Sequence, residues 1–229
     1  MAEHEKTSSK TSLDYEVVRP PPRKQTRYKC ILLGEPHVGK TSLAQRIAHD
    51  HFDHSNRSTI FPSFVLRKVR LSSGQVVALE IWDTAGQERF HSLSHSYYRG
   101  VKAAVIVYDS DSRAHIGDQL KDVVYNLGRK DLEVKIFLVG TKIDLGMDFA
   151  FTDIELESLG KKEGVVIEGH FLLSSKTGEN VEDTVKAWAE VLSRESDRRR
   201  FEESMKAETI RISGEIPQTD RQLKTGCDC

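Results

Sequence analysis

The sequence has few cysteines, no long apolar run and almost no net charge. Its three cysteines, Cys30, Cys227 and Cys229, are too few for a disulfide framework, which favours a reducing compartment. No stretch approaches the roughly 20 apolar residues of a membrane-spanning helix. The first ten residues lack the apolar core of a secretory signal. The second residue, Ala2, is not the glycine that N-myristoylation requires.

The sequence also lacks an excess of charge of either sign. The 34 lysines and arginines are balanced by 35 aspartates and glutamates, so no overall field draws the chain toward nucleic acid or anionic lipid. No basic patch with interleaved aromatic residues is visible, and we expect no nucleic-acid partner. Hydrophobic residues make up 38% of the 229 residues, which is enough for one sizeable core.

The apolar segments alternate in a way that predicts an α/β fold. Two near-continuous apolar runs, 103–109 and 134–140, are typical of parallel strands covered on both faces. Strands are also predicted at 28–34, 64–71, 76–83 and 169–175. The second and third of these flank a Ser-Ser-Gly-Gln turn and predict an antiparallel hairpin. Helices are predicted at 41–52, 116–128 and 180–207.

The two ends of the chain differ in composition from the middle. Residues 1–26 are polar and contain RPPPRK, which predicts a disordered N-terminal arm with some polyproline character. From about residue 194 the chain is charged and poor in core residues. We therefore expect a globular domain at 27–193, followed at 194–229 by a helix extension and a flexible tail.

A glycine-punctuated loop follows the first predicted strand. Residues 34–41, GEPHVGKT, fit the pattern G-x-x-x-x-G-K-[ST] of a phosphate-binding loop. Its glycines let backbone N–H groups face the phosphates, and the following helix directs its positive end at the same anion. Lys40 can reach the β- and γ-phosphate oxygens, and the Thr41 hydroxyl can bind Mg²⁺. The alternative is a glycine turn before an ordinary helix N-cap.

Three further segments follow predicted strands. WDTAGQE puts Asp83 at a strand end, where it can hold Mg²⁺ through water. The N–H of Gly86 can touch a γ-phosphate, and Gln87 can orient a water. VGTKID places Asp144 where it can accept two hydrogen bonds from the N–H/NH₂ edge of guanine, which adenine lacks. LLSSKTG can close over the base.

These motifs, in this order, resemble a small GTPase of the Ras superfamily, and within it most of all the Rab family. The likeness covers about residues 27–193 and the last three residues, and WDTAGQERF and SYYRG are especially Rab-like. It implies a P-loop G domain whose six-stranded, mostly parallel sheet has one antiparallel strand and helices on both faces. It also implies a switch that binds and hydrolyses GTP with Mg²⁺ and recruits effectors to an intracellular membrane in vesicle trafficking.

The resemblance implies roles for individual residues. Gln87 and Lys40 would be catalytic, Thr59 would sense the γ-phosphate, and Phe52 would pack on the guanine edge. The implied metal ligands are Thr41, Thr59 and Asp83. The implied nucleotide-binding residues are Gly34, His37, Val38, Gly39, Lys40, Thr41, Ser42, Phe52, Thr59, Gly86, Thr141, Lys142, Asp144, Ser174, Ser175 and Lys176.

Partner surfaces and a lipid anchor are implied in the same way. Phe64, Trp82 and Tyr97 match the aromatic trio that Rabs use toward effectors, although half-buried strand packing also explains the first two. An exchange factor, an activating protein and a prenyl-Rab chaperone are the other expected partners. The ending TGCDC is no C-a-a-X box. It resembles the Cys-x-Cys ending on which Rabs carry two geranylgeranyl groups, here on Cys227 and Cys229.

Residues 194–229 carry eight basic and eight acidic residues, so two lipids rather than one lipid and a basic patch would supply stable anchoring. This predicts the cytoplasmic face of an intracellular membrane, in exchange with the cytosol. The alternative is an accidental cysteine pair at the end of a soluble protein.

Three residues of the expected nucleotide site depart from the family pattern. Pro36 has no N–H, but the inward donors come mainly from later residues, so the loop should still bind phosphate. Its ring would lie beside the γ-phosphate and Gln87, and we expect slow intrinsic hydrolysis. Thr141 replaces the usual Asn, and its hydroxyl can make the same tethering hydrogen bond. Ser175 replaces the usual Ala, where the backbone N–H matters.

Other functions remain open at this stage. Pro36 is compatible with a GTP-loaded scaffold that barely hydrolyses, although Gln87 argues against it. A P-loop ATPase or kinase is the third possibility, and Asp144 after Thr-Lys argues against that. The histidines and aspartates at 49–54 resemble a metal cluster, but a solvated helix end running into a loop explains them without a metal.

Overall fold

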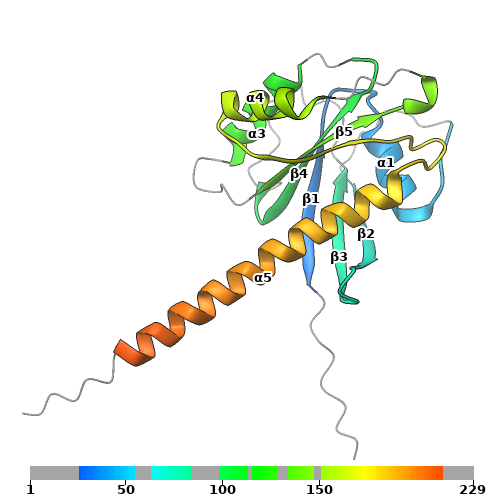
Figure 1. Cartoon of the computed structure of the whole chain (residues 1–229). Helices are drawn as coiled ribbons and strands as arrows, with labels where there is room; N and C mark the ends of the chain where they lie inside the picture. Colours follow the sequence, from blue (N-terminus) through cyan, green and yellow to red (C-terminus); the bar gives the residue numbers. More distant parts are fainter. Residues whose placement is uncertain are drawn as a thin grey trace, which may run out of the picture.

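The computed structural model describes residues 26–54, 63–83, 98–112, 115–127, 134–146 and 151–213. Its centre is a six-stranded sheet in the order β2-β3-β1-β4-β5-β6 (Figure 1). The strands are β1 (Arg27–Leu33), β2 (Ser63–Arg70), β3 (Val76–Asp83), β4 (Val101–Asp109), β5 (Lys135–Thr141) and β6 (Ile167–Leu172). The helices are α1 (Lys40–His49), α3 (Ile116–Leu127), α4 (Asp153–Glu163) and α5 (Val181–Ser213), with a short 3-10 turn, η1 (Ile143–Leu145).

The pairing of the strands confirms the predicted fold class. β2 runs antiparallel to β3 through the predicted hairpin, and every other pairing in the sheet is parallel. In a parallel arrangement the carboxyl ends of the strands meet at one edge. Here that edge carries Asp83 at the end of β3 and the loops after β1, β5 and β6, which contain motifs found in the sequence.

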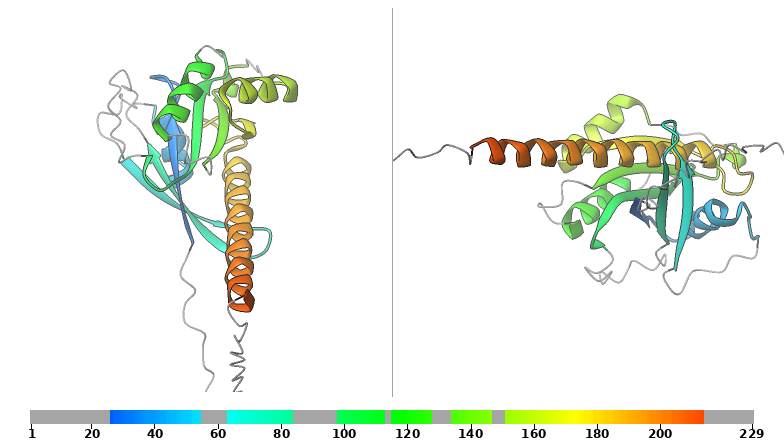
Figure 2. Two further views of the ribbon diagram at one scale, coloured as in Figure 1. Left: turned by 90° about the vertical axis from the view of Figure 1, so that its left-hand side faces the viewer. Right: turned by 90° about the horizontal axis from the view of Figure 1, so that it is seen from below.

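Alternate residues of the central strands fill two separate cores. Along β1, Cys30 and Leu32 face the core under α1 and α5, whereas Ile31 and Leu33 face the core under α3. Because both faces are covered by helices (Figure 2), both sets of side chains are buried. This explains why β1, β4 and β5 read as continuous apolar runs rather than as alternating patterns.

α5 is longer than the sequence predicted. The predicted helix ended at 207, but α5 continues to Ser213 and projects beyond the sheet (Figure 1). The expected boundary at residue 193 falls inside this helix, and Glu195 lies within 3.5 Å of Lys135 at the start of β5. No helix in the described part of the chain is both long and apolar enough to cross a bilayer.

Helix α4 was not predicted from the sequence. Its signal is a capping box: the Thr152 side chain accepts from the N–H of Glu155, and the Glu155 side chain accepts from the N–H of Thr152. α1, in contrast, is shorter than predicted and ends at His49. It ends there because Asp50 takes a left-handed conformation with φ of 50°, which the helix cannot continue through.

Candidate functional site

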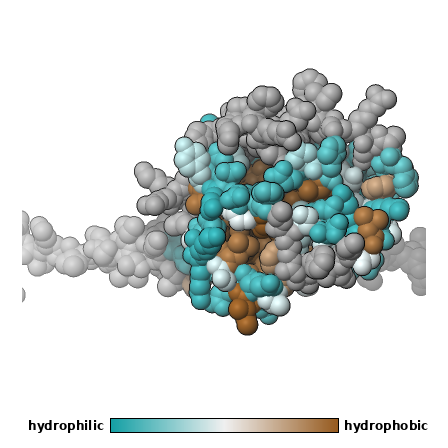
Figure 3. Space-filling model, turned by 90° about the horizontal axis from the view of Figure 1, so that it is seen from above, coloured by the Kyte–Doolittle hydropathy of each residue, from teal (hydrophilic) through white to brown (hydrophobic). Residues whose placement is uncertain are grey.

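The predicted site residues that the structure describes gather at the carboxyl edge of the sheet. β1 leads into the loop at 34–39, β3 ends at Asp83, β5 leads to η1, and β6 leads to the loop at 173–178. Figure 3 looks onto this end of the molecule and shows a mostly hydrophilic surface with a few hydrophobic residues set into it. Four segments far apart in the sequence thus contribute to one site.

The loop between β1 and α1 depends on backbone conformations that suit glycine. Gly34 has φ of 144° and Gly39 has φ of 99°, both in the region that side chains rarely adopt. A Cβ added to Gly34 would overlap the carbonyl oxygen of Val107 in β4. His37 has φ of 66° without being glycine, which histidine tolerates better than most residues. The chain can therefore wrap closely against β4.

Lys40 lies inside this loop rather than in solvent. Its ammonium group donates to the carbonyl oxygen of Gly34 and, at 2.9 Å, to that of Glu35. The residue is only 5% exposed. An ammonium group held at the mouth of a loop of backbone donors is placed to pair with phosphate oxygens.

Asp83 supplies an unsatisfied buried carboxylate next to the loop. It is 1% exposed, and neither carboxylate oxygen has a hydrogen-bond partner among the described residues. Burial raises the pKa of Asp83, while the nearby Thr41 hydroxyl and Lys40 ammonium lower it. These two groups offset burial only in part, and a buried carboxylate whose hydrogen bonding is incomplete is costly unless a cation satisfies it. Asp83 and Thr41 offer the hard oxygen ligands that Mg²⁺ prefers, so the residues present fit that ion.

Thr141 joins the phosphate loop to the end of β5. Its hydroxyl lies 2.5 Å from the carbonyl oxygen of Val38 and 3.1 Å from that of Tyr108. This is the tethering hydrogen bond expected of a threonine at this position. Because Thr141 is 1% exposed, the bond is shielded from water and links two loops of the site.

Asp144 is held in one orientation by the loop after β6. The Ser174 hydroxyl donates to Oδ1 of Asp144 at 2.6 Å, and the Lys176 ammonium lies 3.6 Å from Oδ2. The Asp144 side chain is 12% exposed. Its neighbour Lys142 is held by an ion pair with Asp109 at 2.7 Å. The structure thus brings Asp144, Ser174 and Lys176 together, as the resemblance implies.

Ser175 makes its contact in the described structure through its backbone carbonyl rather than through its side chain. It is 6% exposed, and its hydroxyl has no hydrogen-bond partner in the described part of the chain. Its carbonyl oxygen accepts a hydrogen bond from Arg46 of α1. Sequence reasoning missed Arg46, because an arginine near the end of an amphipathic helix carries no motif.

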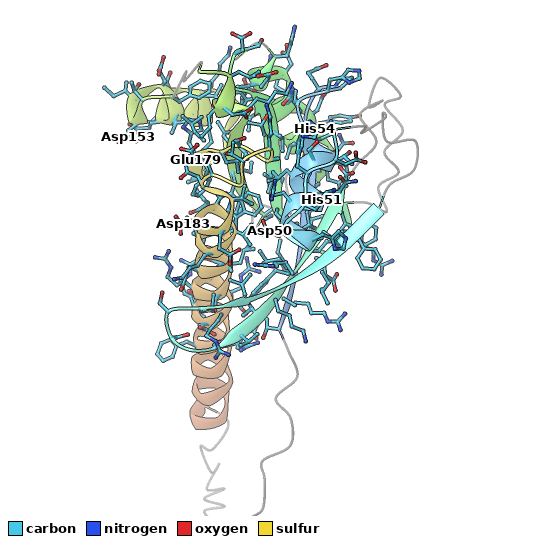
Figure 4. All side chains as sticks on the ribbon, turned by 90° about the vertical axis from the view of Figure 1, so that its right-hand side faces the viewer. Asp50, His51, His54, Asp153, Glu179 and Asp183 are labelled. Atoms are coloured by element: carbon cyan, nitrogen blue, oxygen red, sulfur yellow. The ribbon has the colours of Figure 1, made fainter. Side chains whose placement is uncertain are left out.

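The segment after α1 contains Phe52, which was expected to pack on a guanine edge. Phe52 is half-buried and lies edge-on to His54, with ring centroids 5.0 Å apart. Figure 4 shows Asp50, His51 and His54 in this segment. The Asp50 carboxylate pairs with Arg46 at 3.0 Å. Within the described ranges, no three histidine, cysteine or acidic side chains are grouped to hold a metal.

Two of the three predicted effector aromatics lie together on the surface. Phe64 of β2 is directly opposite Trp82 of β3, and their rings stack with centroids 5.4 Å apart. Phe64 remains 58% exposed. This exposed fraction is larger than the packing of a half-buried strand residue would leave. Several predicted residues lie outside the described part of the chain: Thr59, Gly86, Gln87, Tyr97, Cys227 and Cys229.

Comparison with known proteins assigns this site to a family. A model of the Ras family matches residues 29–194, a range that contains the phosphate loop, Asp83, Asp144 and the loop after β6. The chain belongs to the Ras family. Within the Ras superfamily it is a Rab-like small GTPase, as its similarity to Rab and Ypt proteins shows.

Three Rab and Ypt relatives illustrate the similarity. The GTP-binding protein ypt5 of Schizosaccharomyces pombe is 37% identical over 166 residues, which cover 72% of this chain and 77% of the relative. Ras-related protein Rab-5A of Dictyostelium discoideum is 36% identical over 157 residues, covering 69% and 76%. Ras-related protein Rab-21 of Homo sapiens is 37% identical over 159 residues, covering 68% of each chain.

Proposed function

We propose that this Rab-like protein binds GTP and GDP with Mg²⁺, hydrolyses GTP, and acts as a nucleotide-controlled switch on an intracellular membrane in vesicle trafficking. The observation that carries the proposal is the hydrogen bond from Thr141 to Val38. It joins a phosphate loop to the strand end that leads to Asp144. The loop that would bind phosphate and the carboxylate that would accept from a base edge thus belong to one connected structure.

Guanine selectivity follows from Asp144. Its carboxylate is mostly buried and is oriented by Ser174, so it can accept hydrogen bonds from the N1–H and the amino group of guanine. Adenine has no donor at the equivalent ring nitrogen, and its binding would leave a buried carboxylate unpaired. A site built for such hydrogen bonds rejects the mismatched base by on the order of 10⁴-fold.

Phosphate binding and hydrolysis depend on charge and position. Lys40 would pair with the β- and γ-phosphates, and Thr41 and Asp83 would hold Mg²⁺, which supplies charge neutralisation between the phosphates when bound. Gln87 would orient the attacking water. An activating protein would contribute an arginine, as activating partners do for related switches.

Switching and membrane attachment complete the proposal. Thr59 and Gly86 would respond to the γ-phosphate and so change the surface that includes Phe64 and Trp82. Effectors would then bind only one nucleotide state, with an exchange factor and a prenyl-Rab chaperone acting in the cycle. Lipids on Cys227 and Cys229 would anchor the protein. A tagged chain without its last three residues should then lose its membrane localisation.

The central test exchanges the base that Asp144 recognises. We expect the parent to bind GTP on the order of 10⁴-fold more tightly than ATP. Asp144→Asn should bind GTP more weakly and XTP more tightly than the parent does, because an amide can donate to the xanthine O2 where the carboxylate cannot. Asp153→Asn, an exposed acid at the start of α4, is the control and should change neither affinity. Comparable ATP and GTP affinities in the parent would overturn the proposal.

A second candidate is a GTP-bound scaffold that hydrolyses slowly. Pro36 favours it, because the proline ring is partly buried in the loop between Glu35, whose carbonyl binds Lys40, and the left-handed His37. Single-turnover hydrolysis with an activating protein separates the two candidates. A parent that stays GTP-bound in that assay supports the scaffold.

A further inference from the structure

Arg46 connects the helix that follows the phosphate loop to the loop after β6. Its Nε donates to the carbonyl oxygen of Ser175 at 2.7 Å, and its Nη2 donates to that of Lys176 at 2.7 Å. These two oxygens are consecutive along the backbone, which suits the planar fork of a guanidinium group. The Arg46 side chain is 12% exposed and Ser175 is 6% exposed, so the bond between them is largely protected from water, whereas Lys176 is an exposed residue.

The third nitrogen of Arg46 reaches the end of its own helix. Nη1 donates to the carbonyl oxygen of Asp50 at 2.8 Å and to Oδ1 of Asp50 at 3.0 Å. Asp50 is the left-handed residue that ends α1, and Phe52 follows two residues later. One guanidinium therefore holds both segments expected to flank a base. In Figure 4, Asp50 lies beside the loop that carries Glu179.

The bonds that Arg46 makes differ from those that shape the loop itself. Within the loop, Gly178 donates to the carbonyl of Ser174 and Thr177 donates to the Ser174 hydroxyl. These bonds preserve the local turn, and the bond from Ser174 to Asp144 ties the loop to η1. The bonds from Arg46 tie the same loop to α1, which begins with Lys40 and Thr41.

We infer that Arg46 is a positioning residue for the guanine base: it holds the loop at 174–178 and the segment at 50–54 on the helix that carries the phosphate-binding residues. The inference rests on the proposed guanine-nucleotide binding. Without Arg46 the base-side loop would remain folded but would open more often. Nucleotide release would then be faster, because release requires that loop to move away from the base.

The relative strength of the contacts says which of them matter. The ion pair with the Asp50 carboxylate is weak, since that side chain is 90% exposed. The bond to Ser175 matters most, because Ser175 is 6% exposed and loses the donor to a buried carbonyl group when Arg46 is replaced. The bond to the exposed Lys176 completes the fork but contributes less. Lysine has one ammonium group on a flexible stem and cannot reproduce the fork. Arg46→Lys should therefore rescue the site only in part.

The test measures how fast bound nucleotide leaves. The full chain is loaded with fluorescent GDP and chased with excess unlabelled GDP for the parent, Arg46→Met and Arg46→Lys. We expect release from Arg46→Met to be roughly ten-fold faster than from the parent, with Arg46→Lys between them. Amide hydrogen exchange should increase at 174–178 and remain unchanged in β1 and β4.

The matched control is Arg67→Met. Arg67 of β2 also links two elements through its guanidinium, with Nη2 2.7 Å from a carboxylate oxygen of Glu182 in α5. Within the described part of the chain, its guanidinium makes no hydrogen bond to 50–54 or 174–178. Its release rate should stay within about two-fold of the parent. This control distinguishes the general effect of removing an arginine that links two elements from the specific effect of removing Arg46.

Each outcome has one meaning. Parental release rates in Arg46→Met, or faster amide exchange spread over the whole sheet, would overturn the inference while leaving guanine binding intact. A parent that shows no preference for GDP over ADP would overturn the proposed function instead. Should Arg46→Met not fold, Arg46→Lys decides, and release at the parental rate would again overturn the inference.

Discussion

The hydroxyl oxygen of Thr141 lies 2.5 Å from the carbonyl oxygen of Val38. These two residues are far apart in the sequence, one at the end of β5 and the other in the loop after β1. Their hydrogen bond joins the loop proposed to bind phosphate to the strand end that leads to Asp144, the proposed base-binding residue. Since the hydroxyl has a single hydrogen, the nearer carbonyl of Val38 is its main acceptor, in preference to Tyr108.

Replacing Thr141 tests this link. Thr141→Val keeps the shape of the side chain but removes the donor, leaving the buried carbonyl of Val38 without its partner. We expect GDP affinity to fall by roughly ten-fold and stability to fall by about 1–3 kcal/mol. Thr141→Ser keeps the hydroxyl and should retain near-parental GDP affinity. Titration with GDP and thermal melting measure both effects, and parental affinity in Thr141→Val would contradict the link.

Gly34→Ala tests the close approach of the phosphate loop to β4. Gly34 and Gly74 both have positive φ, at 144° and 83°, so alanine strains the backbone at either position. Only at Gly34 does the new Cβ overlap another residue, the carbonyl of Val107, whereas at Gly74 nothing lies within 4 Å. Gly34→Ala should therefore cost about 1–3 kcal/mol more in urea unfolding than Gly74→Ala. Equal costs would mean that the loop can move away freely.

Pro36→Ser tests the effect of the proline on hydrolysis. Crowding beside Gln87 would misplace the attacking water, and a displacement of about 1 Å can cost on the order of 100-fold in rate. Single-turnover GTP hydrolysis should therefore be faster in Pro36→Ser, with GTP affinity unchanged within a few-fold. Glu35→Ser, at the exposed neighbouring position, is the control and should hydrolyse at the parental rate. Equal rates in all three proteins, with and without an activating partner, would refute the crowding argument.

The ion pairs of Glu195 should make the stability of the fold around α5 depend on pH. Burial raises the pKa of Glu195, but hydrogen bonds from Arg198 and Arg199 and the nearby Lys135 outweigh burial and lower it to about 2. Because this folded-state pKa lies below the unfolded value of about 4.3, the ionised carboxylate stabilises the fold at neutral pH. That contribution is lost as the pH falls from the unfolded value toward the folded one.

Glu195→Gln checks the sign of this effect. The variant should melt at a lower temperature than the parent at neutral pH. Its melting temperature should then fall less than that of the parent between about pH 5 and about pH 3. Glu203→Gln, an exposed glutamate further along α5, should follow the parent. A parallel loss in the parent and Glu195→Gln would show that the ion pairs around Glu195 do not contribute.

The main strands of the fold were predictable because each one leaves a local pattern in the sequence. Continuous apolar runs predicted β4 and β5 as covered parallel strands, and a Gly-containing turn predicted the β2–β3 hairpin. The loop at 34–41 and Asp144 could be proposed as site residues from the sequence, because binding phosphate and guanine demands particular residue types at fixed spacing. Helix α4 was missed although its capping box is local, since its apolar periodicity is weak and half of its length is charged.

What the sequence by itself determined is the set of groups available at the site: the glycine loop, Lys40, Thr41, Asp83 and Asp144. Only the tertiary structure decided how they are held. The bond from Thr141 to Val38 and those from Arg46 to Ser175 and Lys176 join residues more than 100 positions apart. Such contacts depend on the order of the strands in the sheet and on which helix covers which face. The spacing of residues in the sequence does not reveal which distant carbonyl a hydroxyl or a guanidinium group will bind. Only the packing of β5, β6 and α1 brings these partners within hydrogen-bonding distance.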